Sequence, residues 1–227
     1  SFLALIIGLL FIKVTEPPRA SGSMGEVFRE GLDYAWHTWP VRMLILTLMA
    51  LNLTASAYAV LLPVFARDVF AGNATTLGWL WGAAGGGAFM ATIFLATRRR
   101  LPGLISAVVA GCVISALSII VFALASTLPL AMGAMIGVGF GISVCNVGIN
   151  MLLQGMAPDQ LRGRVVSFFT SARFGFDALG GLFAGLLATA IGAGPSLLAE
   201  GVVLLVFVAF LLSRRRRLLA LVTESHG

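Results

Sequence analysis

The stretch Met156–Asp177, MAPDQLRGRVVSFFTSARFGFD, contains a turn, two loop arginines and an apolar segment with one basic and one acidic residue. Arg173 and Asp177 are four residues apart, so they share one face of a helix. Counted from Val165 at about 1.5 Å per residue, they lie roughly 12 and 18 Å into a hydrocarbon core about 30 Å thick. Charges at that depth usually face a protein interior or a water-filled cavity. The stretch therefore predicts a polar feature deep within a membrane-spanning helix.

The overall composition predicts an integral membrane protein. Apolar residues make up 59% of the chain and charged residues 11%, whereas soluble domains carry about 25% charged residues. The net charge of +6 would suit a nucleic-acid partner, but the arginines fall between apolar runs, where charges set membrane topology. We therefore expect a lipid bilayer and no nucleic acid as a partner. Cys112 and Cys145 lack metal-site or redox spacing and are interpreted as packing residues.

Six apolar segments are long enough to span a membrane. They are Met43–Ala66, Leu77–Thr97, a third from Pro102 to about Ser126, Leu128–Ala157, Val165–Ile191 and Ser196–Leu212. An all-α fold follows, with four parts. Residues 1–12 end an earlier membrane helix, 13–40 form a loop with an amphipathic helix, 41–213 form the six-span domain, and 214–227 form a basic tail.

The basic residues predict the orientation of these spans. With the loop before Met43 on the cytoplasmic side, all but two of the 15 basic residues fall on that side or in its loops. The exceptions are Arg67, on the outer side, and Arg173, within a span. Because basic residues concentrate on the cytoplasmic side of membrane proteins, we expect the C-terminus to be cytoplasmic.

Glycines are concentrated in the second, fourth and fifth spans. Small residues let membrane helices approach closely, which serves either static packing or helices that slide and rock, and both interpretations stay open. The segment GVGFGI at 137–142 lacks the third glycine of a dinucleotide motif and has no strand–helix unit around it, so no nucleotide cofactor is expected.

Polar side chains inside the spans form the candidate pathway for substrate or protons. The first span contains Asn52 and Tyr58, and the fourth contains Asn146, Asn150 and Gln154 at successive i+4 positions. Such a stripe either lines a pathway or hydrogen-bonds to neighbouring helices.

The charged residues inside the spans are also open to two interpretations. Arg173 and Asp177 either pair statically or couple substrate to protons, together with Glu200 near the outer end of the last span. Asp177 is the favoured proton carrier, because burial favours the protonated form of a carboxyl group.

Four motifs carry a family resemblance. They are REGLDYAWHTWPVRMLI at 29–45, LLPVFARDVF at 61–70, a glycine-rich span ending in RRR at 98–100, and APDQLRGRV at 157–165. Together they resemble the C-terminal half of a major facilitator superfamily transporter, and within it the bacterial enterobactin-exporter-like and drug efflux branch. The resemblance implies helices seven to twelve, arranged as two inverted three-helix repeats, with residues 1–12 ending helix six.

The resemblance also implies a function. It implies proton-driven efflux of a small molecule, such as a drug or siderophore, by alternating access across the bacterial inner membrane. The proton gradient would be the energy source, no cofactor would be needed, and the missing N-terminal six-helix half would be the partner.

One motif departs from the superfamily pattern. The segment ATRRRLPG at 96–103 lacks the acidic residue of the usual gate motif. Asp159, Arg162 and Arg164 are therefore better candidates for the cytoplasmic gate.

Two other protein classes are alternatives to a transporter. A membrane-embedded enzyme is not supported, because His37 and His226 lie outside the spans and no intramembrane Ser–His or paired-carboxylate arrangement can be built. A channel-like or non-transporting component would tolerate neutral residues at 173 and 177, whereas a coupled transporter would not. Uptake by the same fold is a further alternative, since only the branch resemblance favours export.

Overall fold

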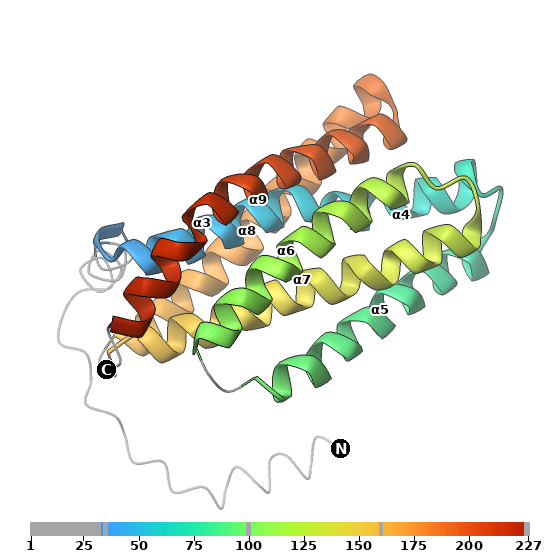
Figure 1. Cartoon of the computed structure of the whole chain (residues 1–227). Coiled ribbons are helices and arrows are strands. Elements are labelled where there is room, and N and C mark those ends of the chain that lie inside the picture. The colour runs from blue at the N-terminus through green and yellow to red at the C-terminus, as the bar shows by residue number, and fades with distance from the viewer. Residues whose placement is uncertain (1–32, 34–35, 99–100, 159–160, 225–227) are drawn as a thin grey trace, which may run out of the picture.

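Six apolar helical spans run back and forth in one bundle (Figure 1). The computed structural model describes residues 33, 36–98, 101–158 and 161–224, with the backbone alone at 101–102 and 215–224. The first span consists of α3 (Trp39–Ala55), α4 (Ala57–Val64) and the π-helix η1 (Phe65–Val69). The others are α5 (Ala74–Ala96), α6 (Leu101–Ala123), α7 (Leu128–Met156), α8 (Arg162–Ile191) and α9 (Ala193–Glu224). The predicted six-span all-α fold is confirmed.

The helix boundaries differ from the predicted ones at two places. Helix α8 begins at Arg162, so the arginines expected in a loop lie in its first turn. Helix α9 continues to Glu224 through most of the predicted basic tail, because arginine and leucine favour helix and no glycine or proline interrupts them. The predicted helix end at 1–12 and most of the loop at 13–40 lie outside the described residues.

Local sequence signals account for several helix ends. The Asn73 side chain accepts hydrogen bonds from the backbone of Thr75 and Thr76, and the Thr76 hydroxyl accepts one from the Asn73 N–H, which forms a capping box at the start of α5. Helix α7 begins with Pro129 in its first turn, where a missing N–H costs nothing. Gly192, with φ 91°, ends α8 in a conformation that other residues rarely adopt.

The packing of the helices follows an inverted-repeat pattern. Helix α5 packs on α7, helix α8 packs on α3, and α6 packs on α9. The first unit consists of the first span, α5 and α6, and the second consists of α7, α8 and α9. The second helix of each unit therefore packs on the first helix of the other unit. Two units of opposite orientation related by a pseudo-two-fold axis give this arrangement.

Basic residues gather at one end of the bundle. At this end α3 and α8 begin and α5 finishes, and it contains Arg42, Arg98, Arg162 and Arg214. It is called the Arg214 end. The opposite end, where η1, α6 and α8 finish, is called the Gly192 end and contains Arg67 paired with Asp68.

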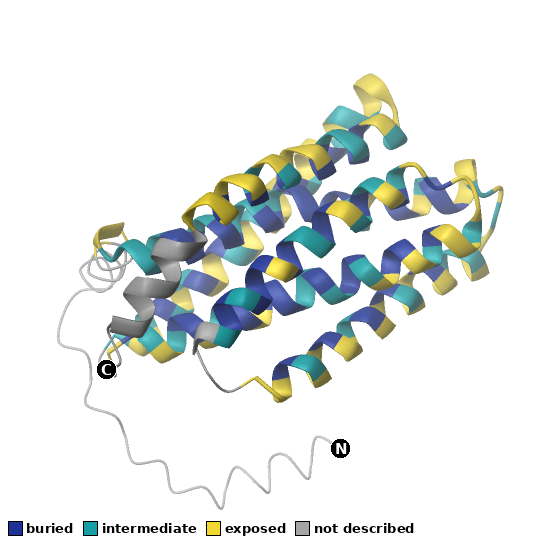
Figure 2. Ribbon diagram, in the orientation of Figure 1, coloured by how far each residue is buried: buried dark blue, intermediate teal, exposed yellow. Residues whose placement is uncertain are grey.

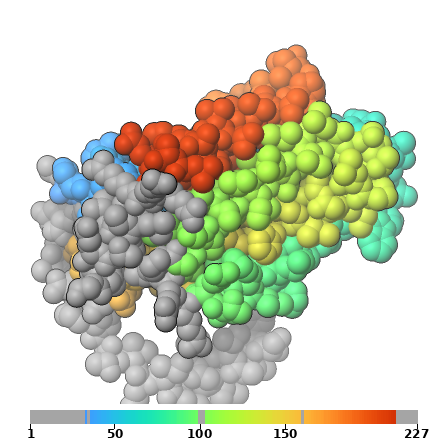
Figure 3. Space-filling view, in the orientation of Figure 1, coloured from blue at the N-terminus to red at the C-terminus, as the bar shows by residue number. Residues whose placement is uncertain are grey.

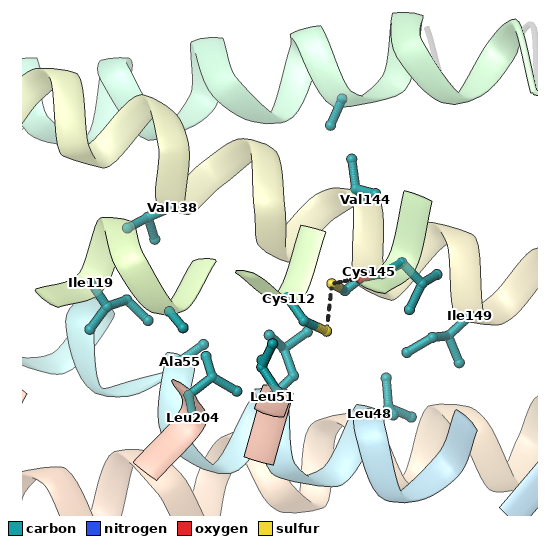
Figure 4. Packing of buried hydrophobic residues seen from close by; sticks show 14 of the residues in the cluster. Leu48, Leu51, Ala55, Cys112, Ile119, Val138, Val144, Cys145, Ile149 and Leu204 are labelled. Atoms are coloured by element: carbon teal, nitrogen blue, oxygen red, sulfur yellow. Dashed lines mark hydrogen bonds between the residues drawn. The ribbon is translucent and has the colours of Figure 1, made fainter. Parts of the chain in front are cut away.

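The core lies between α3, α6, α7 and α9 (Figures 2 and 4). Figure 4 shows Leu51 of α3 near Cys112 of α6, and Leu48 of α3 on the side of Ile149 of α7, all of them buried. The sulfur atoms of Cys112 and Cys145 lie 3.2 Å apart as free thiols in this fully buried region. Both cysteines are buried among apolar side chains, as predicted for packing residues, but the sequence did not predict that they would touch.

Backbone contact at glycine joins α5 to α7. A Cβ atom at Gly87 would overlap the carbonyl oxygen of Ile136, and one at Gly139 would overlap the carbonyl oxygen of Ala84. Gly82 and Gly86 are different, because a Cβ atom there would meet nothing within 4 Å. The glycines therefore divide into contact positions and exposed positions on the same helix.

This division predicts the effect of alanine substitutions. Gly87→Ala or Gly139→Ala should force the two helices apart and cost about 1–3 kcal/mol of stability, because overpacking costs that much in other close-packed interiors. At this chain length that corresponds to a fall in Tm of roughly 2–12 °C. Heating the detergent-solubilised chain and measuring the remaining monodisperse fraction gives the Tm.

Gly82→Ala and Gly86→Ala are the matched controls and should leave the Tm unchanged. Equal losses at all four positions would contradict the assignment of Gly87 and Gly139 as contact glycines.

Candidate functional site

The first span is broken at Ser56, between α3 and α4. The Ser56 hydroxyl donates to the carbonyl oxygen of Asn52 at 2.7 Å, and the Ala59 N–H donates to the Ser56 carbonyl at 3.1 Å in an i+3 bond. Serine hydroxyls that bond four residues back compete with the helix backbone and often bend it. The break places Asn52 just before it and Tyr58 just after it.

Asn52 and Asn146 form a hydrogen bond between α3 and α7. The Asn52 side-chain nitrogen donates to the Leu48 carbonyl at 2.8 Å and to the Asn146 side-chain oxygen at 3.1 Å. Each of the two asparagines is only 5% exposed. Of the two interpretations of the polar stripe, hydrogen bonding between helices is the one that describes this pair.

Asn150 and Gln154 form a second polar group, nearer the Arg214 end. The Gln154 amide nitrogen donates to the Asn150 side-chain oxygen at 2.9 Å on the same helix. Arg162 donates to the backbone carbonyl of Gln154 at 3.2 Å, which ties the start of α8 to the end of α7. Arg164 is half-buried in the same turn of α8. Asp159, the predicted acidic member of the gate, lies outside the described residues.

Arg173 and Asp177 lie on α8 but do not form an ion pair. Among the described residues, no Arg173 nitrogen lies within 4.0 Å of an Asp177 oxygen. The Arg173 guanidinium lies 5.2 Å from the centre of the Phe174 ring instead. Asp177 is exposed on α8, and α8 packs against α4, the helix that carries Tyr58.

Gly180 holds this part of α8 against the helix break. A Cβ atom at Gly180 would overlap both the Leu53 carbonyl and the Ser56 hydroxyl. Asp177 lies within one turn of Gly180, so this contact brings the turn of α8 that carries Asp177 next to the break. Asn52, Ser56, Tyr58, Asn146 and Asp177 therefore form one candidate site from three spans, here called the break site.

The break site borders the least covered surface of the bundle. In the most apolar stretch of α8 only 11% of the residues are buried, compared with 61% for the first span. On α5, next to the site, the Trp81 ring lies 5.9 Å from the Tyr58 ring and is itself exposed. A carboxylate on such a surface needs a protein partner or a water-filled cavity, because hydrocarbon does not solvate it. No group of three metal-ligating residues occurs among the described residues.

Some features of the site were not predicted. No proline or glycine of the first span lies at Ser56 itself, and the hydroxyls of Thr54 and Ser56 both bond back to the helix backbone there. The Tyr58–Trp81 contact joins the first and second spans, and which faces of two consecutive helices meet does not follow from residue spacing alone.

Comparison with known proteins agrees with the resemblance seen in the sequence. Residues 1–224 match the model of a major facilitator family described as "Transmembrane secretion effector". The multidrug efflux pump Tap of Mycolicibacterium fortuitum is 31% identical over 192 residues, which cover 83% of this chain and 46% of that protein. The Tap pumps of Mycobacterium bovis and Mycobacterium tuberculosis are 32% identical over 174 residues, or 75% of this chain and 40% of each pump. The chain thus spans less than half the length of these curated relatives.

The hydrogen bond across α3 and α7 predicts a coupling between its two asparagines. In a double-mutant cycle, Asn52→Ala and Asn146→Ala should couple by about 0.6 kcal/mol, the average found for hydrogen bonds between membrane helices. The measurement is the free energy of unfolding of each variant in mixed micelles.

The matched cycle pairs Asn52→Ala with Asn150→Ala and should show no coupling, because Asn150 bonds to Gln154 on its own helix. Coupling of the same size in both cycles would rule out a specific Asn52–Asn146 bond.

Proposed function

Because the chain belongs to the transmembrane secretion effector family of the major facilitator superfamily, we propose that it is the C-terminal half of a proton-driven exporter of small molecules. The observation that carries the proposal is Asp177, a carboxylate placed at the break site on a surface that the bundle itself leaves uncovered. The efflux activity named for the Tap relatives supports export rather than uptake.

The uncovered surface suits a second helical bundle. Its exposed apolar side chains on α5 and α8 include Trp79, Phe89, Phe174 and Phe183, and exposed glycines such as Gly82 and Gly175 leave room for close helix contact. A covering bundle would enclose Asp177 and the Tyr58 hydroxyl in a cavity between the two halves. We assign this surface to the N-terminal six-helix half of the same transporter.

Asp177 is the proposed proton carrier. A carboxylate in an enclosed site favours either a proton or a cationic group, because an unpaired charge there is costly. Protons and a cationic or polar cargo would then compete for the same position, and such competition couples their movement in opposite directions. The neighbouring Tyr58 hydroxyl and the Asn146 amide would orient the bound group.

The Arg214 end is proposed to face the cytoplasm. That end contains five described arginines, namely Arg42, Arg98, Arg162, Arg164 and Arg214. The described basic residue at the Gly192 end is Arg67, which is paired with Asp68. The positive-inside rule supports this orientation in a bacterial inner membrane. The bond from Arg162 to the Gln154 carbonyl would then belong to the cytoplasmic gate.

The first test of this function is transport in proteoliposomes with an acidic lumen. The transporter that contains this chain should accumulate one or more members of a panel of dyes and siderophores, and Asp177→Asn should abolish that gradient-driven accumulation. Asp68→Asn is the matched control, because Asp68 is exposed and paired with Arg67 at the end of the bundle, and it should retain transport.

Gradient-driven accumulation by a folded Asp177→Asn variant would remove Asp177 as the proton carrier. A channel-like protein would give a different result for the parent itself, because it would equilibrate the cargo across the membrane without accumulating it.

The length of the chain gives a second prediction. A cavity between two bundles needs both, so the purified 227-residue chain should show no transport in the same liposomes. Co-reconstitution with the N-terminal half should restore it. Accumulation of cargo by the monomeric chain alone would refute the proposed two-half cavity.

A further inference from the structure

Glu200 is a buried acidic residue that the break site does not use. It lies on α9, seven residues after the start of that helix, and therefore about 10 Å along the span from the Gly192 end. The residue is only 9% exposed. Helix α9 packs along α6 and also contacts α3, α4 and α8 (Figures 1 and 3).

The surroundings of Glu200 are apolar. The next residue, Gly201, lies against the side chains of Ile119 and Ile120 on α6. Leu204, one turn further, belongs to the buried core drawn in Figure 4. The hydroxyls of Ser115 and Ser118 on α6 face Gly141 and Gly137 of α7. Helix α6 therefore turns its polar groups away from α9.

Glu200 has no partner for its charge. Its Oε2 atom is buried without a hydrogen-bond partner among the described residues, and no described basic nitrogen lies within 4.0 Å of its carboxylate. The described parts of the helices packed against α9 carry few titratable groups, and these lie at different depths along the bundle. These groups are the Cys112 thiol on α6, the Tyr58 hydroxyl on α4, Arg42 at the far end of α3, and Arg162, Arg164, Arg173 and Asp177 on α8.

None of these groups is placed to neutralise Glu200. Counting residues from the Gly192 end places Asp177 about 10 Å deeper than Glu200 along the bundle axis, and Arg173 deeper still. Burial of an unpaired carboxylate costs far more than burial of the neutral acid. A metal ion is not favoured, because hard cations need several oxygen ligands and no cluster of three candidate ligands occurs among the described residues.

We propose that Glu200 is a second proton-binding site of the transporter, protonated in this conformation and exchanging its proton with the Gly192 end during the transport cycle. In the exchange, one proton passes from a hydronium ion to the carboxylate, leaving water and a neutral acid, and release is the reverse. Ser196 lies one turn nearer that end on the same face and is buried, with its hydroxyl bonded to the Gly192 carbonyl at 2.6 Å. The exchange step depends on the proposed proton-driven function.

Infrared spectroscopy of the reconstituted transporter tests the bound proton directly. The parent should show a carboxylic-acid C=O band at neutral pH that shifts in D2O and disappears in Glu200→Gln, while Asp68→Asn keeps it. Glu200→Asp should shift the band, which preserves the test if the glutamine variant does not fold. A Glu200→Gln spectrum identical to that of the parent would overturn the proposal.

Transport measures whether that proton is exchanged. With the membrane potential clamped to zero, each proton coupled to one cargo molecule multiplies the limiting accumulation about tenfold per unit of pH gradient, since a tenfold ratio corresponds to about 1.4 kcal/mol. Glu200→Gln should therefore lower steady-state accumulation about tenfold at a one-unit gradient and retain cargo exchange without a gradient.

The possible failures are distinguishable. Accumulation equal to that of the parent would refute exchange at Glu200, even if the infrared band is present. A parent that shows no gradient-driven accumulation would refute the proposed function instead, and the infrared experiment would still decide whether Glu200 binds a proton.

Discussion

Close contact between helix backbones is the constraint on which the rest of this bundle depends. Lipid is as apolar as leucine, so burial from lipid supplies no net attraction, and membrane helices are held by packing and by hydrogen bonds between them. At Gly87 and Gly139 the backbones of α5 and α7 touch, and at Gly180 the backbone of α8 touches that of α3. These are the two equivalent contacts of an inverted repeat, and they fix where each polar side chain lies.

The break site follows from the second of these contacts. Gly180 rests on the Leu53 carbonyl and on Ser56, at the point where the first span changes from α3 to α4. A larger residue at that position would separate α8 from the break and move Asp177 away from Tyr58. Gly180 thus serves both the packing of α8 on α3 and the position of the turn that carries Asp177. The hydrogen bond between Asn52 and Asn146 joins α7 to the same site.

The fold could be predicted from the sequence more fully than the site. A membrane span is recognised from the average hydropathy of twenty or more residues, so single residues have little effect on the prediction of the six spans. The contact between Asn52 and Asn146 depends on which faces of α3 and α7 meet, and the break at Ser56 depends on one hydroxyl group. The i+4 spacing of Arg173 and Asp177 suggested a pair, but a shared helix face permits an ion pair without requiring one, and here the guanidinium lies over Phe174. Among the glycines, spacing could not separate Gly87, which touches a neighbouring helix, from Gly82 and Gly86, which do not.

Asp177 and Glu200 differ in what surrounds their carboxyl groups. Asp177 is exposed on the bundle surface, so in the proposed transporter its affinity for a proton would be set by the bundle that covers α5 and α8. Glu200 is buried against helices of this chain, so the neutral form proposed for it would not depend on a covering bundle. Exchange of the proposed proton at Glu200 would require α9 to move relative to α6, or water to reach the carboxyl group past Ser196. Motion of the two halves against each other would therefore act directly on Asp177, whereas Glu200 would respond only to movement inside this half.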